Sequence, residues 1–155
     1  MMIYKIENIF KNSERRDLLK QCKPYLNHIP TCPAIQTYSD LCNKSHLKPF
    51  FNIIKNKIEE NTKLKLNITK SWMNLDYGDK ENIFWHNHEG YYYSAVYYIQ
   101  TLPFFSSGTL FEEHGFIRMK QNSLLLFPSH LIHGTPSHPF SFIKRYTLAI
   151  DFMMS

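Results

Sequence analysis

From Leu64 the period of this 155-residue chain changes, because Leu64, Leu66, Ile68 and Trp72 alternate with polar residues, and this feature constrains the fold more than any other. Successive side chains of a β-strand point to opposite faces, so an alternation with period two is typical of a strand that is buried on one face. Glycine, proline and asparagine residues interrupt the alternation at short intervals, as they do between strands. The sequence therefore predicts strands at about 64–75, 84–88, 91–101, 108–113, 116–120, 123–127, 130–134 and 145–153.

The first 63 residues have a helical period instead. A short edge strand or arm at 3–10 precedes a helix that begins near Asn12 or Ser13 and ends near Pro24 to Pro30, and residues 30–45 form an irregular connection. A second helix follows, because apolar residues recur there at i, i+3, i+4, i+7 and i+11. Its apolar stripe consists of Leu47, Phe50, Phe51, Ile54 and Ile58.

Helices followed by a run of short strands predict an α+β fold, with the N-terminal helices packed on a double-stranded β-helix, or jelly-roll, barrel. A chain of this length buries roughly 70% of its unfolded surface in one core. We therefore expect a single domain over 1–155, with a helical support region at 1–63 and a jelly-roll catalytic core at 64–155.

Several absences in the sequence bear on where the protein resides. No run of about 18 apolar residues is present, so we expect no membrane span. The first residues lack a basic segment followed by an apolar one, which is the pattern of a secretory signal. Cys22, Cys32 and Cys42 are odd in number and form no CxxC pair, so we expect free thiols in a reducing compartment. The expected location is the cytoplasm, or the host cytoplasm for a viral protein.

The charge is distributed unevenly along the chain. Residues 1–70 carry thirteen Lys and Arg against six Asp and Glu, a balance of +7, and residues 71–155 carry five against seven, a balance of −2. A basic half can contact nucleic acid. However, lysine-rich helices generally expose solvated faces, and the aromatic motifs of nucleic-acid modules do not accompany these lysines. We do not expect a nucleic-acid partner.

The chemistry of the chain is centred on His86 and His88, which stand two residues apart in a predicted strand and so point to the same face. A third histidine, His133, lies on a later predicted strand. Together they can form a facial set of three nitrogens, which suits iron, zinc, copper or nickel. Three protein ligands leave open positions on the ion, which is typical of a catalytic rather than a structural site.

Arg145 begins the last predicted strand, twelve residues after His133, and can point into the same barrel if that strand is a neighbour of the His133 strand. A buried arginine needs an anionic partner, and a ligand carboxylate held by two hydrogen bonds fits that need. Thr147 faces the same way and can add a hydroxyl group to the same carboxylate. The structural alternative is a salt bridge from Arg145 to Glu112, Glu113 or Asp151.

Four pieces of sequence occur together in a characteristic order and spacing. They are 71–74, 85–88 with 94–99, 107–110, and 126–129 continuing through 133–136 to Arg145. Over 71–152, more than half of its length, the chain thereby resembles the 2-oxoglutarate and Fe(II)-dependent oxygenase superfamily. Within it, the chain is most similar to a prolyl-hydroxylase-like branch known from marine bacteria and phages.

The resemblance implies that His86 and His133 bind Fe(II), and that Arg145 with Thr147 holds the distal carboxylate of 2-oxoglutarate. Tyr98 matches a position that often hydrogen-bonds this cosubstrate. The implied activity is a dioxygenase reaction that consumes 2-oxoglutarate and O2, releases succinate and CO2 and hydroxylates a C–H bond, with ascorbate as a candidate reductant. The substrate stays open between a peptidyl residue such as proline, a free amino acid, a nucleobase and a small metabolite.

One position departs from the superfamily pattern, His-x-Asp/Glu followed by a distant His, because His88 stands where the acidic residue is expected. Histidine is common there in the resembling branch, so our first choice is a metal site of three histidines, His86, His88 and His133. The dianion 2-oxoglutarate would then balance the charge of Fe(II). The alternatives are that Glu89 or Glu112 supplies a carboxylate, or that the site is degenerate.

Two other classes of protein stay open at this point. A zinc hydrolase or lyase can use the same histidines with a zinc-bound hydroxide, and a non-catalytic jelly-roll module can bind a partner through its basic helices. A cupin is disfavoured, because Tyr92 and Tyr93 stand where a cupin has a glutamate. The predicted N-terminal edge strand also permits a homodimer.

Overall fold

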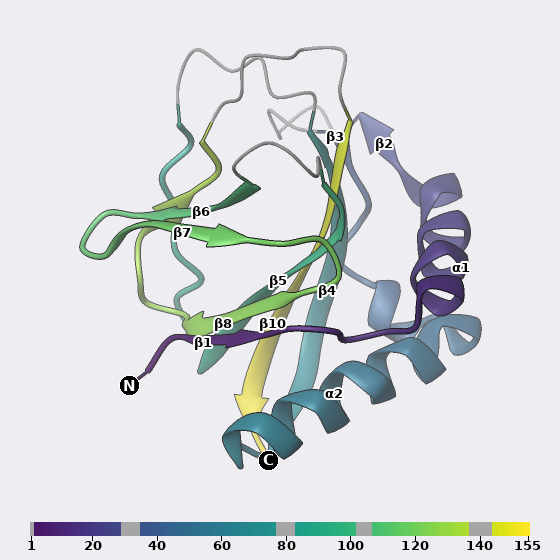
Figure 1. The fold of residues 1–155 in the computed structure, drawn as a ribbon, viewed down its shortest axis with the longest axis horizontal. Helices are drawn as coiled ribbons and strands as arrows, with labels where there is room; N and C mark the ends of the chain where they lie inside the picture. Colours follow the sequence, from purple (N-terminus) through teal and green to yellow (C-terminus); the bar gives the residue numbers. More distant parts are fainter. Residues whose placement is uncertain (1, 29–34, 77–82, 102–106, 137–143) are drawn as a thin grey trace.

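A large and a small antiparallel sheet face each other in the computed structural model, which describes residues 2–28, 35–76, 83–101, 107–136 and 144–155. The large sheet has the strand order β1 (Tyr4–Ile6), β8 (Leu124–Pro128), β5 (Tyr93–Gln100), β10 (Arg145–Met154), β4 (Leu66–Asp76), β3 (Ile35–Gln36) and β2 (Asn27–His28). The small sheet has the order β7 (Gly115–Met119), β6 (Ser107–Phe111) and β9 (His133–Gly134). Figure 1 shows the two sheets with the N-terminal helices beside them.

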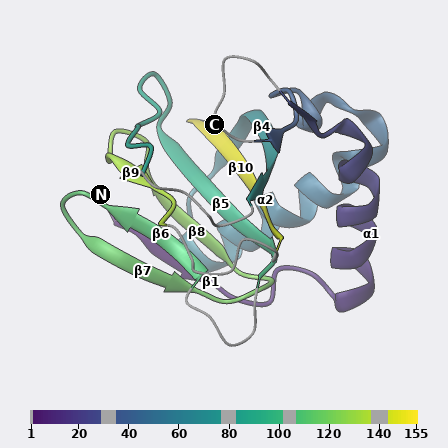
Figure 2. The same cartoon turned by 90° about the horizontal axis from the view of Figure 1, so that it is seen from above.

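The helices α1 (Asn12–Cys22) and α2 (Lys48–Thr62) cover the face of the large sheet that is turned away from β6 and β7 (Figure 2). The backbone N–H of Lys11 donates to the Glu14 carboxylate at 2.9 Å and caps the start of α1. Helix α2 has Pro49 in its first turn and ends at Lys63, whose φ is +63°. Short 3₁₀ helices at Lys23–Tyr25, Leu41–Asn43 and Ser45–Leu47 complete this layer.

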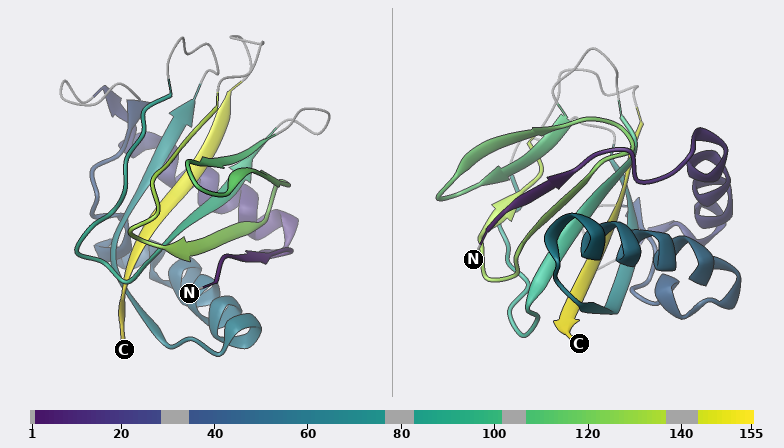
Figure 3. Two further views of the ribbon diagram at one scale, coloured as in Figure 1. Left: turned by 90° about the vertical axis from the view of Figure 1, so that its left-hand side faces the viewer. Right: turned by 60° about the horizontal axis from the view of Figure 1, so that its bottom comes forward.

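The side chains of β10 alternate between the two faces of the large sheet, as the period of a strand requires. One set packs with the helices in the main apolar core and consists of Tyr146, Leu148, Ile150 and Phe152. The other set lines a cavity between the two sheets and consists of Arg145, Thr147, Ala149 and Asp151. Strand β10 lies between β4 and β5 (Figure 3), so the central strand of the sheet serves both the core and the cavity.

The predicted α+β fold with helices on a jelly roll is confirmed. The predicted apolar stripe of the second helix is found, since Phe50, Phe51, Ile54 and Ile58 are buried on α2. The division into a support region at 1–63 and a catalytic core at 64–155 stays a prediction. Within the described ranges, no helix is long and apolar enough to cross a membrane.

The predicted strands at 84–88 and 130–134 are wrong in extent. Only one residue of the first segment pairs as a strand, because His86 exchanges two backbone hydrogen bonds with His133, at 3.0 and 2.9 Å. The next hydrogen bond of this segment runs from the His88 N–H to the Ser129 carbonyl, at 2.8 Å, outside any ladder. The chain then turns at Gly90, whose φ is +96°.

The segment predicted as an irregular connection, 30–45, contributes the short strand β3, which pairs with β2 and β4. Residues 30–34 of that segment, which include Cys32, lie outside the described residues. Cys22 and Cys42 are free thiols, as expected.

Candidate metal centre

Three imidazoles converge between the two sheets. The ligand nitrogens of His86, His88 and His133 all lie within 4.8 Å of one another. The backbone pairing of His86 with His133 brings their ring centroids to 4.4 Å, and the His88 ring lies 5.1 and 5.2 Å from the other two. The structure thus brings together the three histidines selected from the sequence, although His86 and His88 do not share a regular strand.

Each of the three rings has an oxygen atom next to its Nδ1. The acceptor is the Phe84 carbonyl for His86, at 3.1 Å, and the Leu131 carbonyl for His133, at 2.9 Å. For His88 it is the Asp151 carboxylate, at 3.1 and 3.2 Å. A carbonyl or carboxylate oxygen only accepts, so each Nδ1 carries the proton and each Nε2 carries the lone pair. This tautomer is the one that a metal-binding set of Nε2 atoms requires.

His133 is the most enclosed of the three. Burial lowers the pKa of His133 to about 4. The imidazole is therefore neutral at pH 7, as a metal ligand must be.

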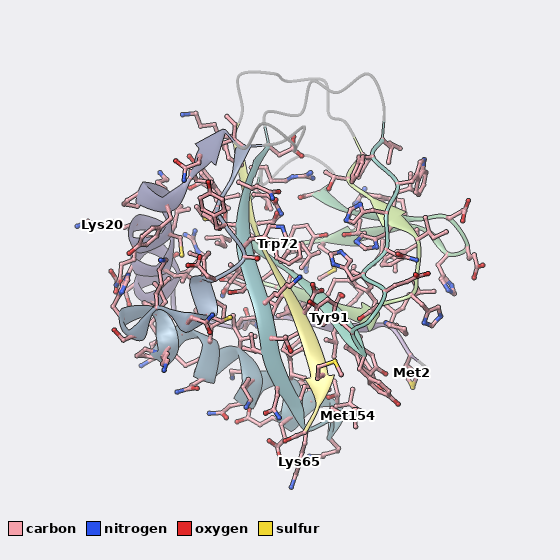
Figure 4. All side chains as sticks on the ribbon, turned by 180° about the vertical axis from the view of Figure 1, so that it is seen from behind. Met2, Lys20, Lys65, Trp72, Tyr91 and Met154 are labelled. Atoms are coloured by element: carbon pink, nitrogen blue, oxygen red, sulfur yellow. The ribbon has the colours of Figure 1, made fainter. Side chains whose placement is uncertain are left out.

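Asp151 is buried behind His88 and is held by two strands. The Ser94 hydroxyl donates to Asp151 at 2.7 Å, and the Ser129 hydroxyl lies 3.1 Å from that of Ser94. A hydroxyl has one hydrogen, so Ser129 donates in turn to Ser94. The ring of Trp72 stacks on the other side of His88 at 5.5 Å, and Figure 4 labels Trp72 on β4. His88 is therefore fixed by a carboxylate at its edge and an indole on its face.

Arg145 lines the same cavity and pairs with a residue that the sequence did not point to. Its Nη2 donates to the Asp76 carboxylate at 2.6 Å, and the two residues are direct neighbours across β10 and β4. The predicted partners for a structural salt bridge, Glu112, Glu113 and Asp151, were wrong. Asp76, the last residue of β4, lies directly opposite Arg145 and takes that place.

The guanidinium of Arg145 is not fully satisfied. Its Nη1 lies 3.4 Å from the Ser107 hydroxyl, which is a long contact. Its Nε is buried and has no hydrogen-bond partner among the described residues. An unpaired buried donor costs roughly 1–3 kcal/mol, so the cavity is incomplete without a further acceptor beside Arg145.

The cavity between the sheets has a volume of about 290 Å³. All six residues selected from the sequence line it: His86, His88, His133, Arg145, Thr147 and Tyr98. The Tyr98 hydroxyl and the Thr109 hydroxyl are 2.6 Å apart, and burial raises the pKa of Tyr98 to about 12, so Tyr98 keeps its proton. The roles of these residues as ligands stay predictions.

The two carboxylates considered as replacement ligands do not belong to the group of histidines. Glu89 and Glu112 are exposed, and Glu89 accepts from the Asn87 amide at 3.3 Å. Among the aromatic residues near the histidines, Trp72 lines the cavity, whereas Trp85 is exposed on the surface and Tyr91 lies outside the cavity.

Sequence reasoning missed Asp76 and Thr109, and it considered Asp151 only as a partner of Arg145, not of His88. A signal for Asp151 was present, because it follows Arg145 and Thr147 on the same face of one strand at a period of two. Asp76 had the same signal, since it follows Trp72 and Asn74 at that period.

No protein-family model matches this sequence, and no curated protein is similar to it. Solved structures are nevertheless similar in fold. They include the non-heme alpha-ketoglutarate-dependent epimerase SnoN from nogalamycin biosynthesis, with a TM-score of 0.73 and 9% identity over 98% of this chain and 78% of that one. The viral collagen prolyl hydroxylase from Paramecium bursaria Chlorella virus-1 has a TM-score of 0.68 and 12% identity over 100% of this chain and 90% of that one.

A third similar structure is an oxidoreductase of the 2OG-Fe(II) oxygenase family from Burkholderia pseudomallei, with a TM-score of 0.64 and 11% identity over 97% of this chain and 84% of that one. The identities are low, so the similarity concerns the fold. The chain has the fold of the 2-oxoglutarate and Fe(II)-dependent oxygenases, and it carries three convergent histidines between the sheets of that fold.

Proposed function

We propose that this protein is a 2-oxoglutarate- and Fe(II)-dependent dioxygenase that binds iron through His86, His88 and His133. The observation that carries the proposal is the coexistence, in one cavity, of three imidazoles whose ligand nitrogens lie within 4.8 Å of one another and an arginine with an unpaired buried donor. A fold by itself does not specify a function, so the proposal depends on these side chains.

The three histidines fit a divalent ion of intermediate softness. Their Nε2 atoms are neutral donors, which suit Fe(II) as well as zinc. Three protein ligands leave the remaining positions of an octahedral ion open for a chelating cosubstrate and O2.

The other end of the cavity fits the distal carboxylate of a diacid. The unpaired Nε of Arg145 gives such a carboxylate a charged donor. Thr147, which is the next residue of β10 on the same face, adds a hydroxyl group. Tyr98 lies opposite Thr147 across β5 and β10 and presents a protonated hydroxyl near the same place. A charge-assisted hydrogen bond from Arg145 would remove the cost of its unpaired donor.

Similar structures agree with this choice of metal and cosubstrate. SnoN is known in complex with Fe3+ and alpha-ketoglutarate, and the viral collagen prolyl hydroxylase is known as a 2OG complex. The ligands belong to those proteins, and we transfer them here because the cavity of this chain offers a metal-binding set and a carboxylate-binding arginine.

When bound, Fe(II) and 2-oxoglutarate supply the chemistry, in which O2 and the cosubstrate are converted to succinate and CO2 and a substrate C–H bond is hydroxylated. The residues of the chain orient the ligands of the metal and shield them from solvent. The hydrogen bonds to Nδ1 fix the orientation of each imidazole. Phe127 packs against His133 and Trp72 stacks on His88, so each aromatic ring limits the access of water to one of the histidines. Arg145 and Thr147 hold the diacid at the far end.

The substrate of the hydroxylation remains open. A peptidyl residue is the first candidate to test, since the viral collagen prolyl hydroxylase has a similar fold. A homodimer, a cytoplasmic location and an origin in a bacterium or virus also stay predictions.

The decisive experiment is an anaerobic titration with Fe(II) and then 2-oxoglutarate, followed by the weak metal-to-ligand charge-transfer band in the visible. We expect the band in the wild-type protein, no metal binding in His133→Ala, and metal binding without the band in Arg145→Ala. Arg16→Ala, a change at an exposed arginine on α1, is the matched control and should leave the band intact. A band that survives Arg145→Ala unaltered would contradict the placement of the cosubstrate. Tight zinc binding without 2-oxoglutarate turnover would instead favour a zinc hydrolase or lyase.

A further inference from the structure

We propose that Asp151 is a positioning residue that supplies, through the His88 imidazole, the negative charge that a directly coordinating carboxylate would give to the metal. This inference rests on the proposed metal site. It explains how a site with histidine at the usual acidic position can hold a divalent ion without a carboxylate ligand.

The geometry places both carboxylate oxygens of Asp151 against one nitrogen. Oδ1 and Oδ2 lie 3.1 and 3.2 Å from the His88 Nδ1. Asp151 comes from β10, whereas His88 belongs to the segment between β4 and β5, 63 residues earlier. The contact therefore depends on the tertiary fold and places Asp151 on the side of the ring opposite the lone pair of Nε2.

Because Asp151 is buried, its negative charge needs a compensating partner. Asp151 is only 2% exposed, and an isolated charge in such a place costs several kcal/mol unless it is compensated. Ser94 donates one neutral hydrogen bond to it, and the opposing lysine on β4, Lys70, is exposed with its amine over the Tyr91 ring at 5.2 Å. A divalent ion on the far side of His88 would provide compensation that these neighbours provide only in part.

The charge count supports the same assignment. In a His-x-Asp site, one ligand carries a negative charge and the two imidazoles are neutral. Here three neutral imidazoles ligate, and the same single negative charge lies one hydrogen bond away, on Asp151. A carboxylate that accepts the Nδ1 proton of a ligating histidine raises the basicity of that histidine and fixes its orientation.

The His88 ring is prepared for this role on its other surfaces as well. Trp72 stacks on it at an interplanar angle of 24°, and the backbone N–H of His88 is held by the Ser129 carbonyl at 2.8 Å. Ser129 also contacts Ser94, which in turn donates to Asp151. The same short network therefore fixes the backbone of the ligand and the carboxylate behind it.

The first test measures Fe(II) affinity anaerobically against a competing chelator. Asp151→Asn keeps an oxygen acceptor for Nδ1 but removes the charge, and we expect it to weaken metal binding about 10- to 100-fold. Asp17→Asn, a change at an exposed carboxylate on α1, is the matched control and should leave the affinity unchanged. Near-ultraviolet circular dichroism verifies the fold of each variant. If Asp151→Asn does not fold, Asp151→Ser provides the same comparison with a smaller uncharged side chain.

The second test distinguishes a charge effect from a merely structural one. His88→Asp restores the usual acidic ligand but sets two carboxylates against each other, so it should bind Fe(II) poorly. Adding Asp151→Asn to His88→Asp should then strengthen metal binding, whereas the same change weakens it beside His88. This reversal of sign is the specific signature of the proposal.

The outcomes of these tests distinguish a failure of the proposed function from a failure of the role proposed for Asp151. If the wild-type protein binds no divalent ion, both the proposed function and this inference fail. If the wild-type protein binds Fe(II) and the uncharged variant of Asp151 binds it equally well, only this inference fails. A loss of similar size in both backgrounds, beside histidine and beside aspartate at position 88, would show a structural role and would also overturn it.

Discussion

The two faces of the large sheet are built from the same strands, yet they serve opposite purposes. On the helix-facing side of β10, Leu148, Ile150 and Phe152 are fully buried among apolar neighbours of α1 and α2. On the cavity-facing side, Arg145 and Asp151 are buried charges with only part of their hydrogen-bonding capacity used inside the chain. The first face stabilises the fold, and the second carries the buried polar groups of the proposed site.

The difference shows that neighbouring residues of one strand can have different roles, because one faces the apolar core and the next faces the cavity. Apolar burial is worth about 25 cal/mol per Å² and needs no specific partner. A buried charge lowers stability unless a partner of defined geometry compensates for it. Changes on the helix-facing side should therefore affect stability alone, whereas changes on the cavity side should alter both stability and binding.

The largest effect on stability is expected for Phe152→Ala on the helix-facing side. Removing this fully buried ring should lower the free energy of unfolding by about 3–5 kcal/mol, without a change in Fe(II) affinity at temperatures where the variant is folded. Thr147→Val is its counterpart on the cavity side. It should change stability by less than about 1 kcal/mol but weaken 2-oxoglutarate binding several-fold. Chemical denaturation and cosubstrate titration of both variants measure the contrast, and a loss of Fe(II) affinity in folded Phe152→Ala would break it.

A pH dependence of similar size is expected from His133. Its pKa is about 4 in the folded protein and near 6.5 in the unfolded chain, so between these values the unfolded chain binds the additional proton. The metal-free protein should lose stability as the pH falls from about 6.5 to 4, by at most about 3 kcal/mol from this group. Chemical denaturation in the presence of EDTA, which keeps the protein metal-free, measures the free energy of unfolding at several pH values and tests this. His133→Gln should flatten the dependence, and an unchanged slope in that variant would assign the effect to other groups.

Smaller effects are expected for Asp76→Asn, which should lower stability but strengthen the binding of 2-oxoglutarate. Replacing the carboxylate that occupies Arg145 should lower the stability of the ligand-free protein by about 1–3 kcal/mol. The same change removes an anion that competes with the cosubstrate for the guanidinium, so 2-oxoglutarate should bind about tenfold more tightly, a gain of roughly 1.4 kcal/mol. Thermal unfolding with and without 2-oxoglutarate measures both. Weaker cosubstrate binding in this variant would mean that Asp76 orients Arg145 rather than competing for it.

The smallest effect is expected at Cys22, which lies in the helix-facing core. Burial raises the pKa of the Cys22 thiol to about 12, so almost no thiolate exists at pH 8. A thiol reagent should therefore leave Cys22 unmodified in the folded protein, whereas Cys42, which is half-buried, reacts first. Mass spectrometry of the modified sites verifies this order. Rapid labelling of Cys22 would indicate that the helix layer opens from the sheet more easily than the burial of Leu18 and Leu19 implies.

Much of the fold could be predicted because the patterns that specify it are local. The apolar stripe of α2, the alternation in β4 and the run of strand-forming residues in β5 are visible in short windows, and the structure has a helix and strands there. The segment around His86 was predicted as a strand and is not one, because its hydrogen bonds run to two separate places, His133 and Ser129. A pattern of two histidines gives the spacing of side chains but not the partner that fixes the backbone.

The sequence by itself pointed to the residues that could serve the site, and all of them line the cavity: three histidines, Arg145, Thr147 and Tyr98. Only the tertiary structure decided their pairings, which set Asp151 behind His88 and Asp76 against Arg145. The physical reason is that register between distant strands depends on their whole length. Strand β10 shifts its register on β4 between Asp151 and Phe152, and such an irregularity leaves no mark in the alternation of apolar residues.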